Sequence, residues 1–259
     1  MDRSPELRIE PAPGVIKAAR RWVDRIRRAL GPDFVAAYVT GGALTQGFVP
    51  SRSEVNILVV TLRLDAETLE RIAKVTAQPA RAPRIAPLFL TAAQVRGSLD
   101  VYPIEFLDLH DHHLLLEGEN VLAGVQVSRA DLRLQCEHEL RSRLIELRQT
   151  YLLENRSPSA LAKALAAAGT GWNPLFRALL RLQGEEVPAH NARVIERVAD
   201  LFGVPGEGLL GAYVIRYGKG RPRPSETRVR YLAFLAAVEL LVAELDRLPA
   251  RVAPTPPRG

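Results

Sequence analysis

The sequence of 259 residues contains a single cysteine, Cys136, and no long uninterrupted run of apolar residues. One thiol cannot form an intrachain disulfide, so the disulfide framework of small secreted domains is excluded. No apolar run approaches the roughly 20 residues that a membrane-spanning helix needs. The first residues are polar and include prolines, unlike a secretory signal. These absences predict a soluble protein with no membrane partner, working in a reducing cytoplasm.

Aromatic residues are also scarce, at 6% of the chain, whereas basic residues outnumber acidic ones and give a formal net charge of +6. This charge suits a polyanionic partner, such as nucleic acid or nucleotide phosphates. Because few aromatics alternate with the arginines, a base-stacking surface for single strands is not favoured. The densest basic group is expected on the solvent face of an amphipathic helix. It consists of Arg20, Arg21, Arg25, Arg27 and Arg28.

The first half of the chain, up to about residue 127, alternates short apolar runs with short helical stretches. A helix is predicted over residues 66–76, and Thr91 with Gln94 has the spacing of a capping box. This mixture predicts an α/β (α+β) head domain over residues 1–127. Strands are predicted at residues 34–39, 55–60, 85–90 and 101–109.

The second half of the chain reads as helical throughout. Ser128 is the predicted N-cap of a helix that runs to about Glu154, and Ser157 followed by Pro158 is a second N-cap. An all-helical domain is therefore predicted over residues 128–248, followed by a disordered, proline-rich tail at 249–259. Further helices are expected at residues 174–183, 189–202, 207–217 and 225–248.

Residues 38–60 carry the clearest chemical pattern in the chain. An apolar strand is followed by the tandem glycines Gly41 and Gly42, a polar loop and a second apolar strand. Tandem glycines let the backbone approach a ligand closely, and a helical turn just after them favours an anion. On the second strand the side chains of Glu54 and Asn56 share one face, because side chains alternate with a period of two. Two acids at these positions would converge on one divalent cation.

This segment resembles the active-site region of the nucleotidyltransferase superfamily, which includes DNA polymerase beta and the minimal and aminoglycoside nucleotidyltransferases. In that family Gly-Ser is followed, after a gap, by Asp-x-Asp at the start of a strand. Here Glu54 and Asn56 stand at the two aspartate positions. The resemblance implies a nucleotidyltransferase-like head with a mixed sheet. The nucleotide-binding positions that it implies are Gly41, Gly42, Gly47 and Ser53.

The family's third carboxylate lies on a neighbouring strand between two hydrophobic residues. Glu105 matches this pattern, and on a strand it would point to the opposite face from Asp108, so Glu105 is preferred. The resemblance therefore implies Glu54, Asn56 and Glu105 as the catalytic and metal-binding residues. In an active member such residues hold Mg²⁺, which lowers the pKa of the attacking hydroxyl.

Three departures from the family pattern weaken this site. Gly42 replaces the serine, Glu54 is one methylene longer than aspartate, and Asn56 carries no charge. Magnesium prefers anionic oxygens in near-ideal octahedral geometry. The sequence thus predicts a nucleotidyltransferase-fold protein whose metal-dependent nucleotidyl transfer is impaired or lost. Its expected partner is an NTP, with Mg²⁺ as cofactor only if activity survives.

Alternatives stay open at this point. The chain could be a non-catalytic nucleic-acid- or protein-binding module that uses the fold as a scaffold, its arginines giving a salt-dependent affinity. The strand, glycine turn and strand could also occur in an unrelated α/β protein. A polar stretch nearby fits a structural turn, a nucleotide or metal contact, or an independent metal site. It contains Asp108, His110, Asp111, His112 and His113.

Overall fold

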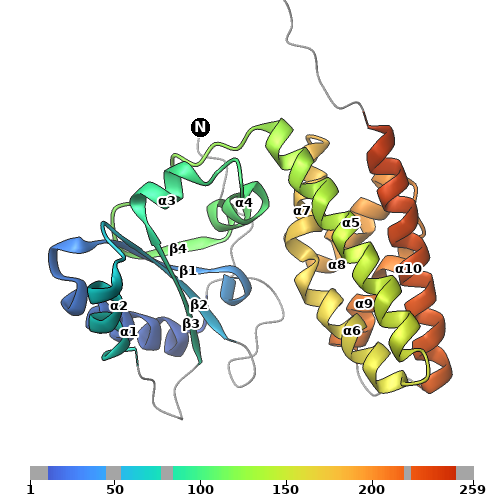
Figure 1. Cartoon of the computed structure of the whole chain (residues 1–259), viewed down its shortest axis with the longest axis horizontal. Coiled ribbons are helices and arrows are strands. Elements are labelled where there is room, and N and C mark those ends of the chain that lie inside the picture. The colour runs from blue at the N-terminus through green and yellow to red at the C-terminus, as the bar shows by residue number, and fades with distance from the viewer. Residues whose placement is uncertain (1–10, 45–53, 77–83, 219–222, 249–259) are drawn as a thin grey trace, which may run out of the picture. The chain divides into compact units, whose positions relative to one another are not determined.

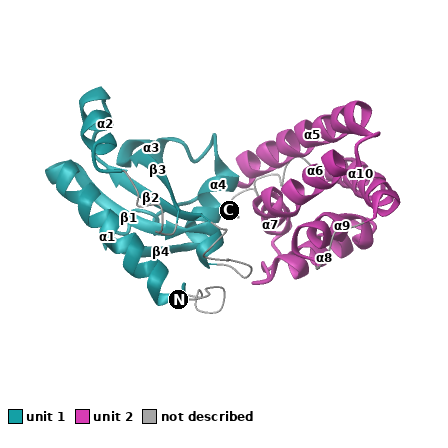
Figure 2. Cartoon of the chain, turned by 90° about the horizontal axis from the view of Figure 1, so that it is seen from below, with its two compact units in different colours: residues 1–127 teal, residues 128–259 magenta. Residues whose placement is uncertain are grey.

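The computed structural model of the chain describes residues 11–44, 54–76, 84–218 and 223–248 (Figure 1). The chain divides into two compact units, Met1–Val127 and Ser128–Gly259 (Figure 2). The first unit contains a four-stranded sheet with helices, and the second is built from helices. The fold is therefore an α+β head followed by a helical domain. Within the described residues, none of the helices combines the length and the apolar character that crossing a bilayer requires.

The sheet is mixed and has the strand order β3-β2-β1-β4. The central strand β1 runs antiparallel to both β2 and β4, whereas β2 and β3 run parallel. The strands predicted at residues 34–39, 55–60 and 85–90 are confirmed. The observed strands are β1 (Phe34–Thr40), β2 (Val55–Thr61), β3 (Ile85–Thr91) and β4 (His113–Gly118).

Helices cover both faces of the sheet. Neighbouring residues of a strand point to opposite faces, so each face presents its own set of apolar side chains to a helix layer. On one face, α1 (Pro13–Leu30) and α2 (Ala66–Ala73) pack against Val39, Ile57 and the residues that alternate with them. On the other face, residues from α3 (Ala92–Gly97) and α4 (Pro103–Asp111) pack against the intervening strand residues. Two apolar layers, one on each side of β1 and β2, form the core of the head.

The arginines of α1 lie mainly in solvent, as the helical pattern predicts. Four of the five are exposed and Arg25 is half-buried, while the opposite side of the helix is buried in the core. Trp22 is also buried there. Arg27 forms an ion pair with Glu117 of β4 at 3.0 Å. Arg20 also donates to the backbone oxygen of Leu116 in β4 at 3.5 Å, so the cluster is a solvated helix face with contacts to the sheet.

Residues 103–109 lie in helix α4, so the strand predicted at residues 101–109 is wrong. The segment VYPIEFLDL is a short, mostly apolar run of strand length, and such a run is compatible with either a strand or a buried helix. Pro103 is nevertheless suited to the first turn of a helix, where an amide hydrogen is not needed. Ile104 and Phe106 are buried on this helix. The fourth strand, β4, comes later, at the histidine and leucine run that ends at Gly118.

The helical unit follows the predicted caps closely. Ser128 accepts a hydrogen bond from the amide of Asp131 at 3.1 Å, and Ser157 accepts one from Ala160 at 3.3 Å. These two N-caps and the helices predicted after them are confirmed. The tail at residues 249–259 lies outside the described residues. The helices of the unit are α5 (Arg129–Glu154), α6 (Pro158–Gly171), α7 (Asn173–Leu182), α8 (Asn191–Phe202), α9 (Gly206–Tyr217) and α10 (Pro224–Arg247).

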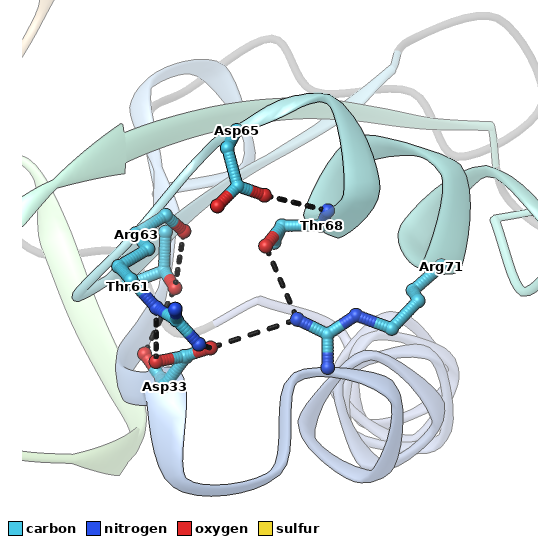
Figure 3. Close-up of polar contacts among 6 residues, drawn as sticks. All are labelled: Asp33, Thr61, Arg63, Asp65, Thr68 and Arg71. Atoms are coloured by element: carbon cyan, nitrogen blue, oxygen red, sulfur yellow. Dashed lines mark hydrogen bonds and ion pairs between the residues drawn. The ribbon is translucent and has the colours of Figure 1, made fainter.

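A buried carboxylate joins the start of β1 to the end of β2 (Figure 3). Asp33, in the short 3₁₀ turn Gly31–Asp33, accepts two hydrogen bonds from Arg63, at 3.2 Å to Oδ1 and 3.1 Å to Oδ2. Thr61, which is fully buried, donates its hydroxyl to the backbone oxygen of Asp33 at 2.8 Å. The hydrogen bonds from Arg63 lower the pKa of Asp33, against the opposing effect of its burial.

The same carboxylate reaches helix α2. Arg71 of α2 lies 3.6 Å from Oδ2 of Asp33 and donates to the hydroxyl of Thr68 at 3.1 Å. The amide of Thr68 in turn donates to Asp65, the N-cap of α2, at 2.9 Å (Figure 3). Asp33 therefore couples the β1–β2 pair to the helix that follows β2.

We expect Asp33→Asn to lower the melting temperature at pH 7. In acid, the melting temperatures of the variant and the wild type should become similar. A carboxyl whose pKa is lowered by folding stabilises the protein above its unfolded pKa, about 3.9 for aspartate, and stops doing so as pH falls through the lowered value. The gap between wild type and variant should thus narrow below about pH 4. Thermal melts from pH 3 to pH 7 measure it, with Asp100→Asn in an exposed turn as the matched control. An equal gap at both ends of the range would contradict the expectation.

Candidate functional site

The residues of the sequence motif meet at one edge of the sheet. Strand β1 ends at this edge, and β2, β3 and β4 begin there, given their directions relative to β1. Thr40 lies opposite Asn56 of β2 and His113 of β4. Side chains directly opposite each other on adjacent strands share a face of the sheet. The candidate site at this edge comprises Thr40, Gly41, Gly42, Glu54, Asn56, Arg84 and His113.

The first glycine of the motif is needed for its backbone conformation. Gly41 has φ +60°, a region that favours glycine, and its amide donates to the backbone oxygen of His112 at 3.0 Å. A Cβ at Gly41 would also lie 3.3 Å from Nδ2 of Asn56. Its amide is thus engaged within the protein, and its role is to shape the turn beside Asn56.

The second glycine stands in a different environment. Gly42 is exposed, and a Cβ built there would have no described atom within 4 Å. Together the two glycines open a 3₁₀ turn, Gly41–Leu44. The other two nucleotide-binding positions that the sequence predicts, Gly47 and Ser53, lie outside the described residues. The structure therefore describes two of the four predicted nucleotide-binding positions, Gly41 and Gly42.

Glu54 and Asn56 both lie exposed at the start of β2. Oε1 of Glu54 forms an ion pair with Nη2 of Arg84 at 2.7 Å. Arg84 comes directly before β3, and its backbone oxygen accepts a hydrogen bond from the amide of Val55 at 2.7 Å. The parallel pairing of β2 and β3 therefore brings residues 54 and 84 side by side. Sequence reasoning missed Arg84 because its only signal is its place just before a predicted strand.

Glu105, the predicted third acid, lies in the first turn of helix α4 and is exposed. The strand-face argument that preferred it over Asp108 is therefore incorrect. On a helix, residues three apart lie on the same side, so Glu105 and Asp108 are neighbours and not opposites. The catalytic role of Glu105 stays a prediction that rests on the family resemblance.

The histidine-rich stretch spans the end of α4 and the start of β4. His112 and His113 are both buried, and Nδ1 of His112 lies 3.3 Å from the Asp108 carboxylate. Nδ1 of His113 lies 2.7 and 3.0 Å from two carbonyl oxygens of the last α4 turn, so it must carry a proton and donate. These contacts favour the structural interpretation of the stretch, in which His113 ties α4 to the sheet.

Tyr38 of β1 is fully buried next to His113. Its ring meets that of His113 edge-on, with centroids 5.4 Å apart. Its hydroxyl donates to the backbone oxygen of Glu119 and accepts from the amide of Val121, each at 2.8 Å. Burial raises the pKa of Tyr38, so the phenol stays neutral at physiological pH. Tyr38 is a structural anchor between β1 and the segment after β4.

The oxygen donors at this edge do not fit a magnesium site. Glu54 contributes one carboxylate, which faces the guanidinium of Arg84, and Asn56 offers at most a neutral carbonyl oxygen. Magnesium requires several well-placed oxygens and prefers anionic ones. Across the part of the chain that the structure describes, no three His, Cys, Asp or Glu side chains are grouped so that they could hold a metal ion.

Comparisons with known proteins show which fold the chain shares. A scan against protein-family models finds no match, and no curated protein sequence matches. Among solved structures, the chain is similar to spectinomycin adenyltransferase AAD(9) from Enterococcus faecialis, a structure with ATP and spectinomycin. The similarity covers 90% of this chain and 100% of that one, with a TM-score of 0.56 and 13% identity. The chain therefore has a nucleotidyltransferase-like fold. At 13% identity the similarity concerns the fold alone.

We expect Gly41→Ala to destabilise the protein and Gly42→Ser to leave its stability nearly unchanged. Alanine at a left-handed position costs about 1–2 kcal/mol. Gly42→Ser, which restores the family's serine, meets no described atom and should stay within about 0.5 kcal/mol of wild type. Urea unfolding of the two variants measures the difference. Equal stabilities would mean that the turn at Gly41 is not held as described.

Proposed function

We propose that this protein binds a nucleoside triphosphate at the described edge of the sheet and that its metal-dependent nucleotidyl transfer is impaired or lost. The observation that carries the proposal is the composition of the edge. Glu54 is paired with Arg84, and Asn56 is neutral at the second acid position. A nucleotide partner is also supported by the fold, because the similar adenyltransferase structure contains ATP.

The residues of this chain would act mainly by positioning. Gly41 shapes the turn that holds the end of β1 beside Asn56, and the exposed Gly42 follows it in the same turn. Mg²⁺ is the cofactor that the family resemblance implies for an active member, but the donors described above do not fit it. If any transfer survives, it would move a nucleoside monophosphate to a hydroxyl acceptor and release pyrophosphate.

A nucleic-acid- or protein-binding module is the second candidate, and the surface charges favour it less. Many of the arginines that produce the positive net charge are paired with carboxylates, which weakens their long-range attraction for a polyanion. These pairs include Arg27–Glu117, Arg141–Asp246, Arg148–Glu239 and Arg197–Glu185.

We expect at least one of ATP, GTP, CTP and UTP to raise the melting temperature of the protein. A ligand at about 100 times its Kd stabilises the folded state by about 2.7 kcal/mol. For a chain of this size that corresponds to roughly 5–10 °C. Thermal-shift titrations with and without Mg²⁺ or Mn²⁺ measure it. No shift with any nucleotide, together with tight and salt-sensitive RNA binding, would replace this proposal with the binding module.

We expect the wild type to release pyrophosphate from ATP at a rate close to background. The double variant Glu54→Asp/Asn56→Asp restores the two acids of the family pattern and draws the first carboxylate away from Arg84. It should be faster by about 10-fold or more, since even the loss of a residue that supports a metal ligand costs about 10–100-fold. The assay uses spectinomycin as a hydroxyl-bearing probe acceptor with Mg²⁺. Equal, rapid turnover by both proteins would contradict the loss of catalysis.

A further inference from the structure

The Glu54–Arg84 pair is held by the backbone as well as by its side chains. The parallel ladder between β2 and β3 begins at Val55 and Ile85, directly after the two paired residues. The amide of Val55 donates to the Arg84 carbonyl oxygen, and the side chains meet at 2.7 Å. The Cα positions of the pair are therefore set by the sheet, so the contact does not depend on a chance meeting of two long side chains.

This arginine stands where the family pattern requires a cation. Glu54 is at the first acid position of the motif, and Nη2 of Arg84 lies in hydrogen-bonding contact with its carboxylate. Two aspartates without a cation would carry two negative charges and repel phosphates. Here the charges of Glu54 and Arg84 cancel and Asn56 adds none, so the edge does not need a metal ion to accept an anion.

The chemistry of arginine suits the phosphates of a nucleotide. The guanidinium is planar, permanently charged and weakly hydrated, and it donates to two phosphate oxygens at once. The Arg84 side chain is 82% exposed, so its donors are accessible from solvent. A triphosphate offers more negative charge and more oxygens than one carboxylate does. It is therefore able to displace Glu54 from Arg84.

We propose that Arg84, in place of a divalent cation, binds the nucleotide phosphates at this edge, and that Glu54 holds Arg84 until the phosphates displace it. This inference rests on the proposed nucleotide-binding function and names the group that performs it. Glu54 is then a competitor of the ligand and not a metal ligand. Removal of its charge should strengthen nucleotide binding, which is the opposite of what a metal site requires.

Calorimetric titration of ATP, in excess EDTA and in excess Mg²⁺, tests the proposal on the whole chain of 259 residues. For the wild type, EDTA should not weaken binding. Arg84→Ala should raise the Kd about 10-fold or more, the usual effect of losing a charged hydrogen bond. Arg84→Lys should lie between, because lysine keeps the charge but not the planar pair of donors. Glu54→Gln should lower the Kd about 2–5-fold, as the loss of an exposed competing ion pair predicts.

Arg28→Ala is the matched control for charge. Arg28 is exposed on α1, which covers the face of the sheet opposite to Asn56, and its replacement removes the same single charge. It should leave the Kd nearly unchanged. If Arg84→Ala fails to fold, the Glu54→Gln and Arg84→Lys results still decide, because they predict changes of opposite sign.

The outcomes separate this inference from the function on which it rests. If ATP binds only with Mg²⁺, and Glu54→Gln abolishes binding while Arg84→Ala does not, the inference is overturned and the nucleotide-binding function stands. If Arg84→Ala binds as tightly as wild type in EDTA, the inference is overturned as well. If wild type binds no nucleotide under either condition, both proposals fail.

Discussion

The pairing register of strand β1 is the constraint on which the head depends. It places Thr40 between Asn56 and His113, and a slip of one residue would send Asn56 to the opposite face. Hydrogen bonds secure both ends of β1, one to the end of β2 and one to the residue before β4. At one end Thr61 donates to the backbone of Asp33, and at the other Gly41 donates to the backbone beside β4. This register therefore sets the relative positions of the residues in the candidate site.

The electrostatics of the site follow from the same arrangement. Strands β2 and β3 run parallel and begin side by side. The residues just before them, Glu54 and Arg84, are therefore neighbours and form an ion pair. A shared fold does not transfer a shared activity, since the activity depends on the donors that a chain presents. This chain presents one carboxylate, one guanidinium and one amide at its motif, a set that suits an anion better than a divalent cation.

The accuracy of sequence-based prediction differed between local and non-local features. The N-caps at Ser128 and Ser157 were predicted correctly because a cap is a contact between residues three apart. Strands β1 and β2 were also recognised, since their buried residues form continuous apolar runs. Helix α4 was mistaken for a strand because a short apolar run is compatible with either structure, and tertiary packing decided between them.

The sequence by itself determined strands β1 to β3, the helices of the second unit, the glycine turn after β1 and the presence of Asn56 at the second acid position. Each of these depends on residues that are close together in the chain. Only the tertiary structure decided which groups surround that motif. It placed Arg84 beside Glu54, because strand pairing joins residues far apart in sequence and no local pattern encodes the partner. It also showed that Glu105 lies on a helix.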